Sequence, residues 1–204
     1  MVQPVSAVPV TWTDWTSATA TSASGQLGSV AVEFAGTVAF AQTGVGINYW
    51  TEGDPPPYTG NDLVDNAPTP AEMVALSAAS INTLTFSEAV TDPLMAIVSL
   101  GRTNLPVTYD FDTPFTVLSE GQGYWGDGWY TTGPGDVLTG YEMHGVIQFL
   151  GTVSAISWTS TAESWHGFTL GLAPLTNVPE PSILALLGIG LVGIAVSRCK
   201  RRKG

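Results

Sequence analysis

Val107-Thr108-Tyr109-Asp110-Phe111-Asp112 alternates apolar and polar side chains without interruption. Successive side chains of an extended strand point to opposite faces, so this pattern is typical of a half-buried antiparallel β-strand. The same alternation recurs at 30–34, 83–86 and 156–159. Two more continuously apolar segments, 95–100 and 146–150, are expected to be central strands, which are covered on both faces.

Turn-forming residues separate these runs. Segments rich in Gly, Pro, Asn and Asp occur at 53–57, 60–70, 101–106, 121–128 and 133–136. Many short strands with such punctuation predict a mainly β fold, an antiparallel β-sandwich of jelly-roll-like form. One short helix is also predicted, because Thr69-Pro70-Ala71-Glu72 has the sequence of a capping box with Pro at the first helical position. It would run to about residue 79.

Charge is distributed unevenly along the chain. Residues 1–177 hold 16 of the 17 acidic residues but only one of the six basic residues, Arg102, so their formal charge is −15. A surface of this kind repels phosphate backbones, which excludes nucleic acid as a partner. The single cysteine, Cys199, excludes a disulfide framework, and the aromatic content of 10% is too high for a disordered chain.

The C-terminal end has the pattern of a membrane anchor. Residues 183–196 contain no polar side chain, and Ser197 follows them. A basic cluster then ends the chain, formed by Arg198, Lys200, Arg201, Arg202 and Lys203. With snorkelling of these cations, 183–197 approaches the length of a single transmembrane helix. The basic end is expected to stay in the cytoplasm, which places the preceding chain outside that membrane. A buried core helix is the alternative.

A short motif precedes this apolar segment and consists of Val178, Pro179, Glu180 and Pro181, followed by Ser182. The motif, the Gly-punctuated apolar segment and the basic tail together resemble the PEP-CTERM sorting signal. The resemblance implies an exported protein of a Gram-negative bacterium, which an exosortase in the inner membrane recognises and cleaves near the motif. It also implies that the periplasmic part then passes to the cell surface or the extracellular polysaccharide.

These observations suggest three regions. Residues 1–7 are interpreted as a remnant of a signal-peptide cleavage region, because Val5-Ser6-Ala7 has the small-x-small pattern of a cleavage site. The secretion signal itself is expected upstream of Met1. Residues 8–177 would form the extracytoplasmic β-sandwich domain, in which 86–172 is similar to ectodomains often found with this tail. Residues 178–204 would form the sorting signal, with the motif at 178–182, the helix at 183–197 and the tail at 198–204.

Two histidines are the only candidate imidazole bases. His144 lies two residues from Glu142, and His166 lies three residues from Glu163. A metal or catalytic site would require the two segments to converge. The alternative is that both histidines are hydrogen-bonded structural residues. Neither a His-Glu-x-x-His motif nor a Gly-x-Ser-x-Gly motif occurs.

Carboxylates support two further hypotheses. Four acidic residues near aromatic segments could supply the pair that glycosidase chemistry requires, namely Glu120, Asp127, Glu142 and Glu163. Asp110 and Asp112 share one strand face and are candidate Ca²⁺ ligands, as are the pairs at 61–62 and 65–66. A solvated acidic face is the simpler explanation. Apart from this Ca²⁺, no cofactor is expected.

Aromatic residues give the best ligand hypothesis. The segment 123–130 contains Tyr124, Trp125, Trp129 and Tyr130 among three glycines and an aspartate. Exposed aromatic rings beside carboxylates can stack on sugar rings and accept hydrogen bonds from sugar hydroxyls. The alternative is that both tryptophans fold inward and cap the sandwich. The sequence therefore predicts a non-enzymatic surface or matrix protein, structural, adhesive or polysaccharide-binding; the alternative is a secreted carbohydrate-active enzyme with paired carboxylates.

Overall fold

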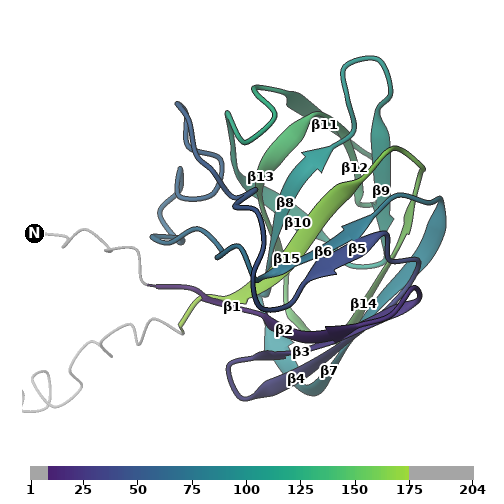
Figure 1. Ribbon diagram of the computed structural model, residues 1–204. Coiled ribbons are helices and arrows are strands. Elements are labelled where there is room, and N and C mark those ends of the chain that lie inside the picture. Colours follow the sequence, from purple (N-terminus) through teal and green to yellow (C-terminus); the bar gives the residue numbers. More distant parts are fainter. Residues whose placement is uncertain (1–8, 175–204) are drawn as a thin grey trace, which may run out of the picture. The chain divides into compact units, whose positions relative to one another are not determined.

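Two antiparallel β-sheets packed face to face make up the part of the chain that the computed structural model describes, residues 9–174 (Figure 1). The predicted β-sandwich is confirmed. In chain order the strands are β1 (Thr11–Trp12), β2 (Asp14–Ala18), β3 (Ser22–Leu27), β4 (Val30–Ala35), β5 (Phe40–Gln42), β6 (Met73–Leu76), β7 (Ser80–Thr91), β8 (Leu94–Leu100), β9 (Val107–Phe111), β10 (Phe115–Glu120), β11 (Trp129–Gly133), β12 (Val137–Tyr141), β13 (Met143–Phe149), β14 (Thr152–Ser160) and β15 (His166–Leu172).

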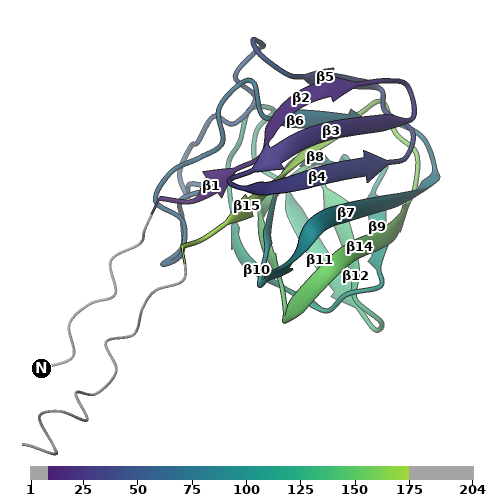
Figure 2. The ribbon, with the colours of Figure 1, turned by 90° about the horizontal axis from the view of Figure 1, so that it is seen from below.

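The smaller sheet has the order β10-β13-β8-β15-β6-β5, with β1 also pairing with β15, and the larger has the order β11-β12-β9-β14-β7-β4-β3-β2 (Figure 2). Alternation decides which side chains enter the space between them. In β9, Val107, Tyr109 and Phe111 are buried whereas Asp110 is exposed. Burying an apolar residue at every second position is what holds each sheet on the other.

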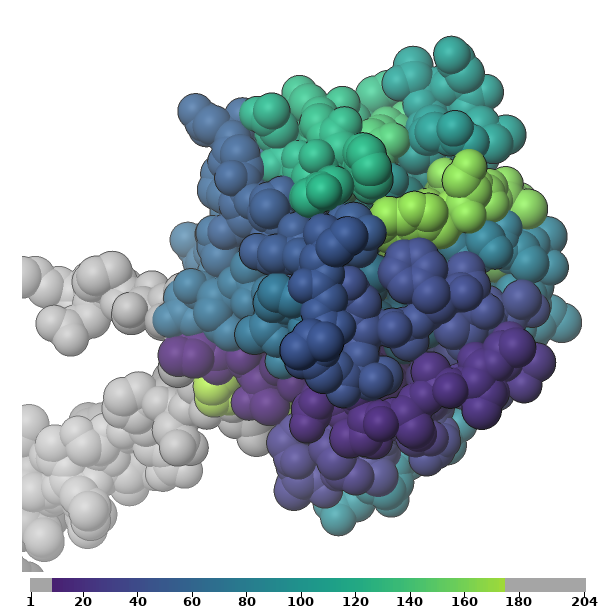
Figure 3. Space-filling view, viewed as in Figure 1, coloured from purple at the N-terminus to yellow at the C-terminus, as the bar shows by residue number. Residues whose placement is uncertain are grey.

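The smaller sheet is covered on its outer face as well. A long segment, 43–72, connects β5 to β6 and packs Trp50, Tyr58 and Val64 against Ala96 and Val98 of β8. Figure 3 shows this blue segment spread over the face that is turned toward the viewer in Figure 1. All seven residues of β8 are therefore buried, as the continuously apolar sequence predicts for a central strand.

The predicted helix at 69–79 is wrong. Its first residues form a turn in which the Glu72 amide donates to the Thr69 carbonyl at 3.0 Å and the Glu72 carboxylate accepts from the Thr69 amide. The next residues are strand β6, which is fully buried and pairs with β5 and β15. The capping interaction thus forms, but sheet pairing of Met73–Leu76 determines the structure that follows it. Within residues 9–174 no helix is long and apolar enough to cross a membrane.

The first and last strands of this part of the chain are neighbours. Thr11 pairs with Leu172 and Trp12 with Gly171, at the end of β15 where the chain leaves the sandwich. Asn66 fixes this corner, because its Oδ1 accepts from the Val10 amide at 2.6 Å and its Nδ2 donates to the Val10 carbonyl at 3.0 Å. Residues 9–174 form one compact unit. The predictions for 1–7, for the helix at 183–197 and for the tail at 198–204 lie outside the described residues.

Candidate ligand-binding groove

Two tight turns border a groove of about 500 Å³ at one end of the sandwich. In the first turn, Arg102 and Leu105 exchange two backbone hydrogen bonds of 2.9 Å. In the second, Gly123 and Gly126 exchange bonds of 2.9 and 3.2 Å, which leaves Tyr124 and Trp125 at the tip. The groove is lined by Arg102, Thr103, Asn104, Leu105, Trp125, Asp127 and Glu142.

Glycine lets the aromatic turn lie close to the sheet. A Cβ atom added to Gly123 would overlap the ring of His144, and one added to Gly128 would overlap the carbonyl of Glu142. Backbone can approach these groups only where no side chain intervenes. The glycines of 123–128 therefore bring the turn that carries Trp125 close to the backbone of Glu142, and both residues line the groove.

Glu142 occupies a strained position between β12 and β13. Its φ is +71°, and Ser99, whose φ is +59°, donates from Oγ to Glu142 Oε1 at 2.5 Å. The pairing of β13 with β8 shifts register between Met143 and Gly145. Left-handed conformations of such residues cost about 1–3 kcal/mol each and cluster at functional sites, where the surrounding contacts maintain them.

His144 is fully buried and lies against Gly123 of the aromatic turn. Its Nδ1 accepts from the Ser99 amide at 3.3 Å and lies 3.4 Å from the Tyr58 hydroxyl. Because Nδ1 is the acceptor, the proton of the neutral ring is on Nε2, which is 3.6 Å from Glu142 Oε1. No hydrogen bond joins the two groups, so within residues 9–174 Nε2 of His144 is a buried nitrogen without a partner, and Glu142 is held by the hydroxyl of Ser99 instead.

Glu163 holds the other turn. Its side chain is only 2% exposed, and its Oε1 accepts from the Gly101 amide at 2.8 Å and from His166 Nδ1 at 2.9 Å. Its Oε2 lies 4.0 Å from Nε of Arg102. These contacts of Glu163 stabilise the turn that carries Arg102.

The two histidines do not form a metal site. They lie on β13 and β15, with β8 between these strands. Within residues 9–174 no group of three or more His, Cys, Asp and Glu side chains is placed to hold a metal ion. Asp110 is exposed, whereas Asp112 Oδ1 accepts from the Thr113 hydroxyl at 2.8 Å and from the Ser157 amide at 2.9 Å.

The asparagines proposed as Ca²⁺ ligands have structural contacts. Besides the contacts of Asn66 described above, Asn61 Oδ1 accepts from the Leu63 and Val64 amides at 2.9 and 3.0 Å. Its Nδ2 donates to the Tyr58 carbonyl at 3.1 Å. These contacts fold the covering segment 43–72.

The four predicted stacking aromatics occupy different places. The residue exposures of Trp125 and Tyr124 are 55% and 40%, and their ring centroids are 4.9 Å apart. Trp129, 47% exposed, stacks on Tyr141 with centroids 3.7 Å apart and planes within 6°. Neither tryptophan is buried as a cap. The aromatic contacts also extend through Tyr124 to Tyr49, which packs on Trp165.

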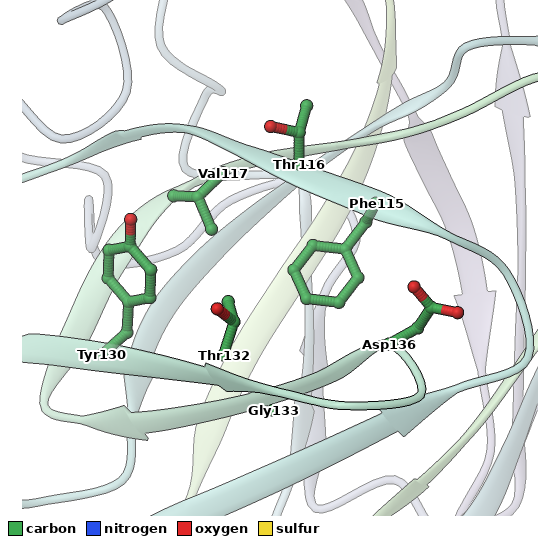
Figure 4. A pocket seen from close by; sticks show the side chains of 7 residues that line it. All are labelled: Phe115, Thr116, Val117, Tyr130, Thr132, Gly133 and Asp136. Atoms are coloured by element: carbon green, nitrogen blue, oxygen red, sulfur yellow. The ribbon is translucent and has the colours of Figure 1, made fainter.

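Tyr130 lines a separate cavity of about 410 Å³ between the edge strands β10 and β11 (Figure 4). Phe115 and Val117 point toward Tyr130 and Thr132, whereas Thr116 points away. The cavity has one carboxylate, Asp136, among its lining side chains. Its two aromatic rings, Phe115 and Tyr130, are half-buried, whereas Trp125 is 55% exposed and is therefore the aromatic residue best placed to meet a ligand.

The four candidate carboxylates also lie in different places. Asp127 and Glu142 line the groove, whereas Glu163 is buried and accepts a hydrogen bond from the Gly101 amide. Burial, and then the negative charge of Asp127, raise the pKa of Glu120. The groove therefore presents two acidic side chains, Asp127 and Glu142, together with Trp125.

Sequence reasoning missed the contribution of the first turn. Arg102 was notable only as a lone cation, and Asn104 carried no signal, yet both line the groove. A turn-forming segment that contains the single cation of an acidic domain was the available clue.

The chain matches the model of the PEP-CTERM protein-sorting motif over residues 177–202. No curated protein and no solved structure matches the chain. The motif includes the predicted residues Val178–Pro181 and the basic cluster up to Arg202, and it implies export and processing by an exosortase. The chain is thus a β-sandwich domain followed by a PEP-CTERM protein-sorting motif, the signal of an exported, exosortase-processed surface protein.

Proposed function

We propose that the β-sandwich is a polysaccharide-binding domain and that the groove beside Trp125 is its binding site. The single observation that carries this proposal is the half-exposed Trp125 ring standing over a groove that also presents Asn104, Asp127, Glu142 and Arg102. An indole ring stacks on the apolar face of a sugar. The surrounding amide, carboxylates and guanidinium supply donors and acceptors for hydroxyl groups.

The shape of the site supports the same function. The groove is open between two turns of the chain, so a polymer could enter and leave without its ends being enclosed. Both turns are held from inside, the first by Glu163 and the second by its close contact with His144. A rigid site loses little side-chain freedom when it binds, which favours affinity.

Trp125→Ala tests this function. In affinity electrophoresis and calorimetry with a panel of bacterial polysaccharides, the wild-type chain should bind at least one member, and Trp125→Ala should weaken binding about tenfold or more. Trp129→Ala is the matched control, because Trp129 is 47% exposed at the start of β11, four residues after Trp125, but rests on Tyr141 outside the groove. Absence of binding, or equal loss in both variants, would refute this site.

A secreted carbohydrate-active enzyme is the second candidate. The observation that favours it is the raised pKa of Glu120 next to Asp127, since a general acid needs a carboxyl that stays protonated beside an ionised one. Release of reducing ends from a bound polysaccharide, abolished by Glu120→Gln and Asp127→Asn, would establish the enzyme. Retention without turnover would leave the binding domain.

The cellular route completes the proposal. The motif supports passage through the inner membrane of a Gram-negative bacterium with the domain in the periplasm, followed by release to the cell surface or extracellular polysaccharide. Immunoblots of fractionated cells should show a shorter, domain-sized form outside the inner membrane. In cells that lack the exosortase, the precursor should remain in the membrane.

A further inference from the structure

The groove has an excess of negative charge. Asp127 and Glu142 line it, and the charge of Asp127 acts on nearby Glu120. The lone cation, Arg102, already has partners, because its Nε is 4.0 Å from Glu163 Oε2 and its Nη2 donates to Ser164 Oγ at 3.2 Å. Among the side chains that line the groove, Arg102 is the one cation against the two carboxylates of Asp127 and Glu142, and it is shared with Glu163, so the groove keeps a net negative charge.

The rest of the domain adds to this local field. Residues 9–174 contain 16 acidic residues and Arg102 as the only Lys or Arg. At physiological salt the electrostatic field of exposed charges extends about 8 Å from the surface. The negative charge of the domain therefore attracts or repels a charged polymer before the polymer contacts the groove. Polysaccharides rich in uronic acids would be repelled, whereas a positively charged chain would be attracted.

We infer that the ligand of the groove is a polysaccharide with protonated amino groups, such as one with partly deacetylated hexosamine units. This inference rests on the proposed function. An ammonium group donates three hydrogen bonds, which match the carboxylate oxygens of Asp127 and Glu142. A cation near the face of an indole such as Trp125 also gains a cation–π attraction.

Other positive ligands fit the groove less well. A divalent metal ion prefers several oxygen ligands, and residues 9–174 place no three His, Cys, Asp or Glu side chains together for one. A metal ion would also leave the ring of Trp125 without a contact. An amino sugar uses both features, because its ring stacks on an aromatic face while its ammonium group meets the carboxylates.

The test compares three oligosaccharides of equal length with the full chain in a detergent that has no sugar head group. The oligosaccharides are a hexosamine oligomer, its N-acetylated form and a uronic acid oligomer, titrated at about pH 6, where amino groups are protonated. We expect the hexosamine oligomer to bind about fivefold or more tightly than the acetylated form. This preference should shrink when salt is raised from about 0.05 M to about 0.5 M.

Variants assign the preference to the groove. Asp127→Asn, on an exposed residue, should remove most of the preference while binding of the acetylated oligomer persists, and Glu142→Gln provides a second isosteric test. Glu88→Gln is the matched control, because it removes one exposed charge from β7 outside the groove. Equal loss of preference in Glu88→Gln would show attraction by net charge alone and would overturn the inference.

The two proposals fail in different ways. Equal binding of the acetylated form, or tighter binding of the uronic acid oligomer, would refute the amino-sugar ligand and leave the polysaccharide-binding groove intact. If neither the three oligomers nor any polysaccharide in the panel bound, both the amino-sugar ligand and the polysaccharide-binding groove would be refuted.

Discussion

Replacing Glu163 by alanine tests how the groove is held in place. The carboxylate is 2% exposed and accepts hydrogen bonds from the Gly101 amide and from His166 Nδ1, at 2.8 and 2.9 Å. These two partners lie on different segments, the end of β8 and the start of β15. The alanine variant therefore removes the acceptor that joins the first turn of the groove to the sheet.

The expected cost follows from the two donors that remain. A buried donor that loses its partner costs about 1–3 kcal/mol, so two of them lower the free energy of unfolding by about 2–6 kcal/mol. This is a large fraction of the total stability of a domain, which is about 5–15 kcal/mol. Glu163→Gln keeps an oxygen acceptor for the Gly101 amide, so its cost should be smaller, about 1–2 kcal/mol.

Urea unfolding of residues 1–174, followed by tryptophan fluorescence, measures these differences. Glu88→Ala is the control, because Glu88 is exposed on β7 and its replacement should change stability by less than about 0.5 kcal/mol. Hydrogen exchange should also accelerate at the Gly101 amide in Glu163→Ala. If Glu163→Ala lowered the free energy of unfolding by less than about 1 kcal/mol and left hydrogen exchange at Gly101 unchanged, the stabilising role of Glu163 would be refuted.

Three further perturbations follow from the same contacts. Gly123→Ala should cost about 1–3 kcal/mol in urea unfolding, because its Cβ would overlap the His144 ring, whereas Gly44→Ala, in open space, should cost less than about 0.5 kcal/mol. Glu120 has a raised pKa in the folded state, so wild-type stability should fall as pH rises through that pKa; Glu120→Gln should flatten this slope in unfolding measured across acidic pH. Alanine substitution of the prolines of the motif, within 177–202, should leave an uncleaved precursor on immunoblots of membrane fractions.

Each of these three has a contrary result. Equal stability of the two glycine variants would mean that the aromatic turn does not need to lie close to His144. An unchanged pH slope in the Glu120 variant would assign that slope to other groups. Normal processing of the proline variant would show that the motif is recognised without its rigid backbone.

Most of the strands could be predicted from sequence because the pattern that specifies them is local. Val107, Tyr109 and Phe111 alternate with polar residues, and the geometry of an extended chain alone puts them on one face. The helix predicted at 69–79 was wrong for the opposite reason. Its capping interaction is real, but Met73–Leu76 becomes a strand because β5, β15 and the covering segment bury it, and these partners are distant in sequence.

The candidate site was only partly predictable. The composition of 123–130 indicated an aromatic surface, and Trp125 is exposed on it. Which ring faces a groove depends on contacts between distant residues, such as the close approach of Gly123 to His144 and the bond from Gly101 to Glu163 across 62 positions. No local pattern encodes such contacts, so the share of Arg102 and Asn104 in the groove could not be foreseen.

The position of β15 has a mechanical consequence. This strand begins at His166, which is hydrogen-bonded to Glu163, and ends at Leu172, shortly before the sorting motif. While the chain is anchored through the motif and holds a ligand in the groove, tension would run along β15. Its hydrogen bonds to β8 and β6 lie across that direction and would be loaded together in shear rather than opened one at a time. Because β15 is paired with β8 on one side and β6 on the other, a pull on its end is borne by the middle of the sheet and not by an edge strand.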